Sequence, residues 1–462
     1  MKSLALAIAV GVLVAAPTVG AAELPRRPNI LFVFTDDQRW DTIGALGNSE
    51  VRTPHLDQLV RDGYHFTNAY CMGSMIGAVC LPSRTMLITG RSLWRIPDNP
   101  RAATAPAGVP LLPQLLNDAG YVTFHHGKAG NACTFGNAAF THNFPSKGHT
   151  IEAATEHANR TIEFLQQHDG QRPFFVYLAP PVPHDPRIAP ERFHQMYPPD
   201  KITLPRNFMP EHPFDNGELR VRDELLAEHP RQPDAMRQHL SDYYAVCSQI
   251  DEEVGRILQV VRERGWDQNT IVIYSSDQGL AVGGRHGLMG KQNLYEHVKP
   301  PLIFYGPGIP AGHSDALVYL FDLFPTICEL AGVTPPDVVE GKSLLPVVHG
   351  KRTRVRDWLF GAYRDCQRMV RDERWKLLEY DAGGERHTQL FDLSMDPDEL
   401  NNLVDDRMHA GQLARMRDLM TVARKFYSDP VDFGQSSPAA APSKPKAKTK
   451  ANANKRAKGK QK

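Results

Sequence analysis

The stretch Asn29–Gln38, NILFVFTDDQ, joins an apolar run directly to two carboxylates and a carboxamide. Its first six residues have the aliphatic and aromatic composition of a strand that is buried on both faces. A second run, Ile271–Tyr274 (IVIY), leads in the same way into Ser275-Ser276-Asp277-Gln278. Strands buried on both faces are typical of parallel sheets covered by helices, so these two stretches predict an α/β fold.

Three further apolar runs predict strands of the same parallel sheet: Tyr121–Phe124, Phe174–Leu178 and Pro301–Tyr305. Helical patterns lie between the runs. The clearest is Ser241–Gly265, where apolar residues recur at helical spacing and a glycine closes the pattern. This alternation predicts a large, mostly parallel β-sheet sandwiched by helices.

The pattern changes after about Val355. Short strands around the turn Arg371–Arg374 and at Gln389–Leu393 predict a small antiparallel sheet, followed by a helix at Met408–Tyr427. We therefore expect four parts: a leader at 1–22, a catalytic α/β domain at 23–355, a small α+β subdomain at 356–435 and a tail at 436–462.

The two ends of the chain have distinct compositions. Residues 1–22, MKSLALAIAVGVLVAAPTVGAA, have the lysine, apolar run and small terminal residues of a secretory signal peptide. This run is short for a membrane span and no later run is long and apolar enough, so we expect an exported protein, periplasmic or extracellular.

The tail Ser436–Lys462 holds eight lysines, one arginine and no acidic residue, whereas the whole chain has a net charge of only +1. The rest of the chain therefore carries a net negative charge. Two interpretations of the tail stay open: electrostatic adhesion to an anionic glycan, surface or nucleic acid, or a disordered solubilising tail without a specific partner. No nucleic-acid motif accompanies it, and the sequence carries no signal for oligomeric state.

Asp36, Asp37, Asp277 and Gln278 follow two strands of one predicted sheet. Ligands gather at the carboxyl ends of strands in open α/β sheets, so these side chains should lie together. Converging carboxylates repel each other unless a cation lies among them, and oxygen donors favour Ca²⁺ or Mg²⁺ over zinc. The sequence thus predicts a divalent metal site.

Cationic residues are expected at the same edge of the sheet. Tyr121–Phe124 leads into His125-His126-Gly127-Lys128, Phe174–Leu178 leads toward Pro183-His184-Asp185-Pro186-Arg187, and Lys291 follows the second acidic pair. Cations beside a divalent metal indicate that an anion binds between them.

Cys80 lies in the stretch Gly77–Arg91, GAVCLPSRTMLITGR. Pro82 predicts the first turn of a helix, which places Cys80 just before a helix N-terminus and beside Arg84. Four roles for Cys80 stay open at this point: half of a disulfide, a nucleophile, a metal ligand, or the precursor of another group. Hard cations do not seek sulfur, so an oxygen at position 80 would suit the acidic residues better. Among the other five cysteines (71, 133, 247, 328 and 366), one or two disulfides are compatible with an oxidising compartment.

These residues resemble the formylglycine-dependent sulfatases, type I sulfatases of the alkaline-phosphatase-like superfamily. The signature C-x-P-S-R followed by T-G-R is matched by Cys80–Arg84 and Thr89–Arg91. RPNILFVFTDDQ, YSSDQG, PHDPR and GLMGKQNLYE resemble further family segments, so the resemblance spans roughly Arg27 to Leu403. It implies an alkaline-phosphatase-like fold and a cysteine that a maturation enzyme oxidises to Cα-formylglycine.

The resemblance also implies roles for the site residues. Ca²⁺, with Mg²⁺ as the alternative, would be bound by Asp36, Asp37, Asp277, Gln278 and the modified Cys80. Arg84 and Lys128 would stabilise the formylglycine hydrate, and His184 and Lys291 would hold the sulfate and help protonate the leaving alcohol. Arg187 and His286 are candidate substrate contacts.

One departure from the family pattern concerns the motif G-K-x-H. Here Gly130 stands where the histidine is expected, and His125, His126 or a residue of another loop could replace it.

The expected function is hydrolysis of a sulfate ester. A sulfated carbohydrate is the expected substrate, and aryl sulfates and choline sulfate are the alternatives. Substrate choice would come from Arg91–Pro100, Arg187–Gln232, the Arg285-His286 loop and the C-terminal subdomain. The alternatives are a phosphonate monoester hydrolase or phosphodiesterase of the same superfamily, and a catalytically idle relative that binds sulfated glycans.

Overall fold

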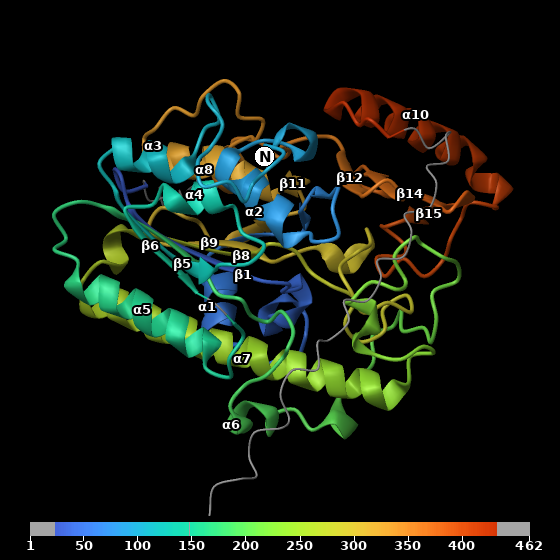
Figure 1. The fold of residues 1–462 in the computed structure, drawn as a ribbon, viewed down its shortest axis with the longest axis horizontal. Helices are drawn as coiled ribbons and strands as arrows, with labels where there is room; N and C mark the ends of the chain where they lie inside the picture. Colours follow the sequence, from blue (N-terminus) through green and yellow to red (C-terminus); the bar gives the residue numbers. More distant parts are fainter. Residues whose placement is uncertain (1–23, 147, 432–462) are drawn as a thin grey trace, which may run out of the picture.

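The computed structural model describes residues 24–146 and 148–431, so the predicted leader at 1–22 and the basic tail at 436–462 lie outside it. Its centre is a sheet of eight strands in the order β10-β2-β9-β8-β1-β7-β5-β6 (Figure 1). In chain order these strands are β1 (Asn29–Thr35), β2 (Tyr64–Phe66), β5 (Val122–Lys128), β6 (His142–Ser146), β7 (Phe174–Ala179), β8 (Thr270–Ser276), β9 (Leu302–Tyr305) and β10 (Gly312–Ser314).

Strand β1 lies in the middle of the sheet and pairs in parallel with β7 and β8. The parallel arrangement continues through β5 to β6. The strand predicted at Pro301–Tyr305 is present as β9, but the expectation that it runs parallel is wrong, because it pairs antiparallel with β8 and β2. Between β8 and β9 the chain forms loops and one short turn of helix in place of a crossover helix, so it returns in the opposite direction.

Helices cover both faces of the sheet (Figure 1). Alternate residues of β1 enter two separate cores, Ile30, Phe32 and Phe34 on one face and Leu31 and Val33 on the other. The first core is closed by α2 (Cys80–Thr89), α3 (Leu112–Asp118) and α8 (Leu323–Leu330), and the second by α1 (Pro54–Asp62), α5 (Ala153–Gln167) and α7 (Pro233–Glu263). The remaining short helices are α4 (Thr134–Ala138), α6 (Glu191–His194) and α9 (Leu345–Val348). This sandwich is the predicted fold class.

Helix α7 begins at Pro233, eight residues before the predicted start at Ser241. Proline is favoured in the first helical turn, and Gln232 before it is extended, so the helix starts where the backbone changes conformation. The apolar pattern begins later because the first turns of this helix carry mostly polar residues. No helix in 24–146 or 148–431 is long and apolar enough to cross a membrane.

The C-terminal residues form the predicted antiparallel sheet, with β12 (Leu359–Tyr363), β13 (Gln367–Arg371), β14 (Trp375–Ala382) and β15 (Glu385–Asp392). Helix α10 (Ala410–Tyr427) follows and packs against it, starting two residues after the predicted Met408. A fifth strand, β4 (Gly73–Ser74), joins in parallel with β12 from the N-terminal half of the chain. Separately, β3 (Ala69–Tyr70) pairs with β11 (Val318–Tyr319). The domain boundary near residue 355 stays a prediction.

The six cysteines lie in the described part of the chain, and all are buried and free. The structure therefore contains neither of the disulfides that the sequence left open.

Candidate active site

The polar residues that follow β1 and β8 meet because these two strands are neighbours in the sheet. Thr35 of β1 pairs with Ser276 of β8, so the residues that follow both strands leave the sheet at one place. The backbone N–H of Asp37 donates to Oδ1 of Asp277 over 3.0 Å. Asp37 has a φ of 66°, a left-handed conformation that is uncommon outside glycine and is often found at functional sites. Asp36, Asp37, Asp277 and Gln278 are all at most 2% exposed.

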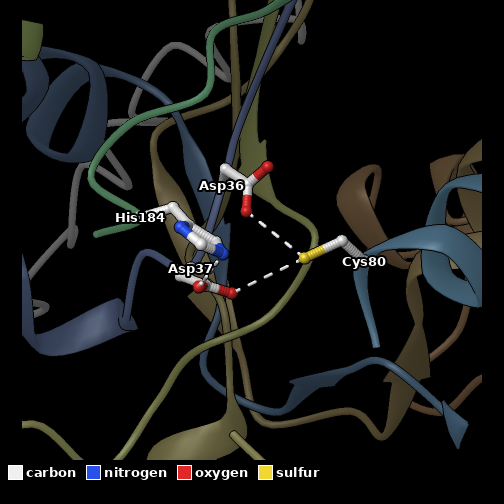
Figure 2. A group of neighbouring side chains, drawn as sticks. All are labelled: Asp36, Asp37, Cys80 and His184. Atoms are coloured by element: carbon white, nitrogen blue, oxygen red, sulfur yellow. Dashed lines mark hydrogen bonds and ion pairs between the residues drawn. The ribbon is translucent and has the colours of Figure 1, made fainter. Parts of the chain in front are cut away.

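Cys80 points toward the carboxylates of Asp36 and Asp37 (Figure 2). Its Sγ lies 3.3 Å from Oδ1 of Asp36 and 3.8 Å from Oδ1 of Asp37. Helix α2 begins at Cys80 itself, so the cysteine is its first residue and does not precede the helix as predicted. Ser83 in the same turn donates from Oγ to the carbonyl oxygen of Asp277 over 2.7 Å, which fixes the helix start against the end of β8.

Three cations neutralise the acidic cluster. Lys128, the last residue of β5, places Nζ 2.6 Å from Oδ2 of Asp36, and Lys291 places Nζ 2.6 Å from Oδ2 of Asp37. The same two nitrogen atoms lie 3.9 Å and 3.4 Å from the Cys80 sulfur. Arg84 contacts both Asp36, at 3.3 Å, and Asp277, at 3.1 Å. Predicted cations and carboxylates therefore form one buried cluster around Cys80.

His184 lies in the loop after β7, with its ring beside Asp37 (Figure 2). Its Nδ1 lies 2.7 Å from the backbone oxygen of Asp185, which can only accept, so Nδ1 carries a proton. Nε2 then lies 3.6 Å from Oδ2 of Asp37. This bond fixes the ring with Nε2 toward the reacting region.

Burial and charge set the protonation of the cluster. Burial raises the pKa of Cys80 well above its ordinary value, and the charges of Asp277 and Asp36 raise it further. The thiol is therefore protonated at neutral pH and is a poor nucleophile. Burial also raises the pKa of Asp36, but Lys128, His184 and Arg84 outweigh it and hold that pKa well below the ordinary range. For Asp277, burial and the Asp36 charge raise the pKa to about 6.

The donor set fits a hard divalent cation. The three buried carboxylates of Asp36, Asp37 and Asp277 lie in one cluster, and ligand atoms of Asp36, Asp37, Cys80 and His184 lie within 4.8 Å of one another. The Gln278 Nε2 atom is buried without a partner in the described chain, so its amide is not committed to another hydrogen-bond network. Oxygen donors of this kind suit Ca²⁺ or Mg²⁺.

The structure does not bring the two candidate substrate contacts into this cluster. Arg187 is buried against α7, with its guanidinium 5.6 Å from the ring of Tyr243 and with Nε and Nη2 unpartnered among the described residues. His286 stacks on Tyr295 with ring centroids 4.0 Å apart and places Nε2 3.0 Å from Glu296. Their contact with substrate stays a prediction.

Two further residues, Arg222 and Asp223, lie beside the site although no sequence pattern predicts them there. Asp223 lies 3.8 Å from Nζ of Lys291 and accepts from Nε2 of Gln292 over 2.9 Å. Arg222 joins Asp223 to Asp185, the residue that holds His184. Both belong to the segment Arg187–Gln232, which was predicted only as a whole to shape substrate choice.

Comparison with known proteins shows similarity to sulfatases. The family model described as Sulfatase matches residues 28–333, and a second, described as N-sulphoglucosamine sulphohydrolase, C-terminal, matches 284–425. The N-acetylgalactosamine-6-sulfatase of Canis lupus familiaris is 30% identical, over 72% of this chain and 68% of that protein. The N-acetylglucosamine-6-O-sulfatase of Bacteroides thetaiotaomicron is 25% identical, over 88% of both chains.

Solved structures share the fold. One, a complex with its substrate D-glucosamine-2-N,6-O-disulfate, has a TM-score of 0.72 at 22% identity and covers 88% of this chain and 99% of that one. The phosphonate monoester hydrolase of Agrobacterium radiobacter also has a TM-score of 0.72, at 21% identity over 87% and 96% of the two chains. Because the Sulfatase model covers most of the chain, the protein belongs to the sulfatase family, within the alkaline-phosphatase-like superfamily, and is a sulfuric ester hydrolase.

Proposed function

We propose that this protein is an exported sulfatase that removes sulfate from a sulfated carbohydrate. It would use a formylglycine made from Cys80 and a bound divalent cation, with Ca²⁺ preferred and Mg²⁺ as the alternative. The observation that carries the proposal is the position of Cys80. Its side chain lies between two carboxylates and two ammonium groups, at 1% exposure. A protonated thiol has little use there, whereas an oxygen function would complete an oxygen cage.

Asp36, Asp37, Asp277 and Gln278 would hold the cation with the modified residue 80. Together, cation and aldehyde hydrate would supply an activated hydroxyl nucleophile and charge stabilisation. The cationic side chains of the protein surround the place where the sulfate would bind. Lys128, Arg84 and Lys291 would offset the negative charge on its oxygens, a contribution that is preorganised because burial and ion pairs already fix these groups.

His184 is the candidate donor of a proton to the leaving alcohol. With Nδ1 held by the backbone of Asp185, only Nε2 can exchange a proton with a group in the pocket. The carboxylates of Asp37 and Asp185 lie 3.6 Å from Nε2 and 3.4 Å from Nδ1, so the ring is positioned from both sides. Lys291 is the second candidate donor.

Two sulfatases of sugar 6-sulfates among the relatives support a carbohydrate substrate. A solved neighbour that binds a disulfated glucosamine supports the same class. We therefore propose a sulfated amino sugar, free or at the end of a longer glycan.

A phosphonate monoester hydrolase is the second candidate, since one such enzyme shares the fold equally well. Turnover of 4-nitrophenyl sulfate compared with 4-nitrophenyl phenylphosphonate separates the two. The idle glycan-binding alternative is disfavoured by the assembled cluster of Cys80, Lys128, His184 and Lys291.

Mass spectrometry of the tryptic peptide Asp62–Arg84 tests the proposal directly. This peptide contains Cys71 and Cys80, so Cys71 is an internal control for alkylation. Protein made together with a maturation enzyme should give a peptide alkylated once, in which residue 80 has lost H₂S and gained one oxygen. A peptide alkylated at both positions, from protein that nevertheless hydrolyses sulfate esters, would contradict the formylglycine proposal.

A further inference from the structure

His149 lies in the loop between β6 and α5, within reach of the catalytic cluster. Its ring centroid is 5.2 Å from that of His184. It also interacts electrostatically with Lys128 and Asp36 of the cluster and with Asp185. No sequence pattern predicts it there, since it lies 21 positions after Lys128.

The His149 ring is not committed to a structural hydrogen bond. Its Nδ1 is buried and has no partner in the described part of the chain. Burial, and after it His184 and Lys128, lower the pKa of His149, so its ring is uncharged at neutral pH. An uncharged imidazole can still donate one hydrogen bond to an anion.

The other histidines near Lys128 are committed elsewhere. Nδ1 of His125 lies 2.8 Å from Oδ1 of Asn143, and its ring stacks on Tyr177. Nδ1 of His126 lies 2.6 Å from the Phe144 oxygen, and its ring stacks on His157. These contacts tie both rings to β6, β7 and α5.

No other side chain of the described chain fills the position of the expected histidine. Gly130 is exposed, and a Cβ atom added there would meet no heavy atom within 4 Å. The histidine that the structure places next to His184 lies instead in the following loop, as His149.

We propose that His149 contacts the substrate, its Nδ1–H donating a hydrogen bond to a sulfate oxygen from the His184 side of the pocket. This role rests on the proposed sulfatase function and adds a residue to it. Lys128, Arg84 and Lys291 then hold the anion by charge, while His149 contributes a directed bond that fixes its orientation.

The test uses the matured, metal-loaded enzyme and two substitutions. His149→Ala removes the ring, whereas His149→Asn keeps an amide nitrogen near the position of Nδ1. Binding of inorganic sulfate is measured by calorimetry, and hydrolysis of 4-nitrophenyl sulfate gives kcat/KM. We expect the alanine variant to weaken sulfate binding and to lower kcat/KM about tenfold, as for a hydrogen bond to a charged group, and the asparagine variant to recover most of both.

His142→Ala is the matched control, because His142 is an exposed histidine of the preceding strand. It should match the wild type in both measurements. Equal sulfate affinity and kcat/KM for His149→Ala and the wild type would overturn the role of His149, as would failure of the wild type to bind sulfate. If the wild type binds sulfate through His149 but hydrolyses no sulfate ester, the proposed function fails and the role of His149 stands.

Discussion

Cys80 is the residue on which the chemistry depends. Replacing it by alanine leaves the fold nearly intact, since only a small buried side chain is lost, but removes the group that we propose becomes the nucleophile. We expect kcat to fall by a factor on the order of 10⁴ with 4-nitrophenyl sulfate. Cys328→Ala is the control, because Cys328 is equally buried in α8 and away from the site. Comparable activity loss in both variants would point to a folding defect and contradict this prediction.

Asp277 should make the metal-free protein sensitive to pH. Its pKa is about 6 when folded, against an ordinary value of 3.8, because of burial and the Asp36 charge. The folded state then binds more protons, so the free energy of unfolding falls as pH rises between these values. A bound cation removes this penalty. Ca²⁺ should therefore raise the unfolding temperature above that in EDTA more at about pH 7.5 than at about pH 5. An equal rise at both pH values, or one unchanged in Asp277→Asn, would argue against it.

At the scale of residues, the sequence predicted the site residues that directly follow strands but not those that lie in long loops. Asp36 and Asp277 directly follow two paired buried strands, so the geometry of a parallel sheet was enough to bring them together. His149 and Asp223 lie in loops whose paths depend on tertiary packing, and no spacing rule relates them to Cys80.

At the scale of elements, β4 shows how closely the N-terminal half of the chain is joined to the C-terminal sheet. Gly73 has a φ of 106°, and a Cβ there would lie 1.9 Å from the carbonyl oxygen of Ala362 in β12. Gly73→Ala should therefore separate the two strands and destabilise the protein by about 3 kcal/mol, measured by denaturant unfolding. Gly77→Ala is the control, since the nearest atom to a Cβ there is 4.0 Å away. Equal stability of the two variants would show that the strand pair is dispensable.

Element type was more predictable than element direction. The apolar run at Pro301–Tyr305 has the composition of a buried strand, and it forms β9. Its direction depends on the connection that precedes it, and the segment between β8 and β9 has no helical pattern, which would have indicated an antiparallel return.

At the scale of the whole molecule, the two sheets share one hydrophobic core. The cluster that contains Phe34 of the central sheet also contains Leu377 and Leu390 of the C-terminal sheet. We expect calorimetry to show a single unfolding transition, and a chain ending at Val355 to be insoluble because it exposes this core. Removal of residues 436–462 is the control and should leave the transition unchanged. Two separate transitions would mean that the C-terminal unit folds independently.

The burial of Cys80 also determines when the proposed conversion to formylglycine can happen. In the folded molecule Cys80 is 1% exposed and its sulfur lies among the carboxylates of Asp36 and Asp37 and two lysines, so an enzyme could not reach it. The proposed maturation step would then precede closure of the central sheet. The yield of active protein would depend on the rate of modification relative to the rate of folding, so conditions that slow folding alone should raise the modified fraction.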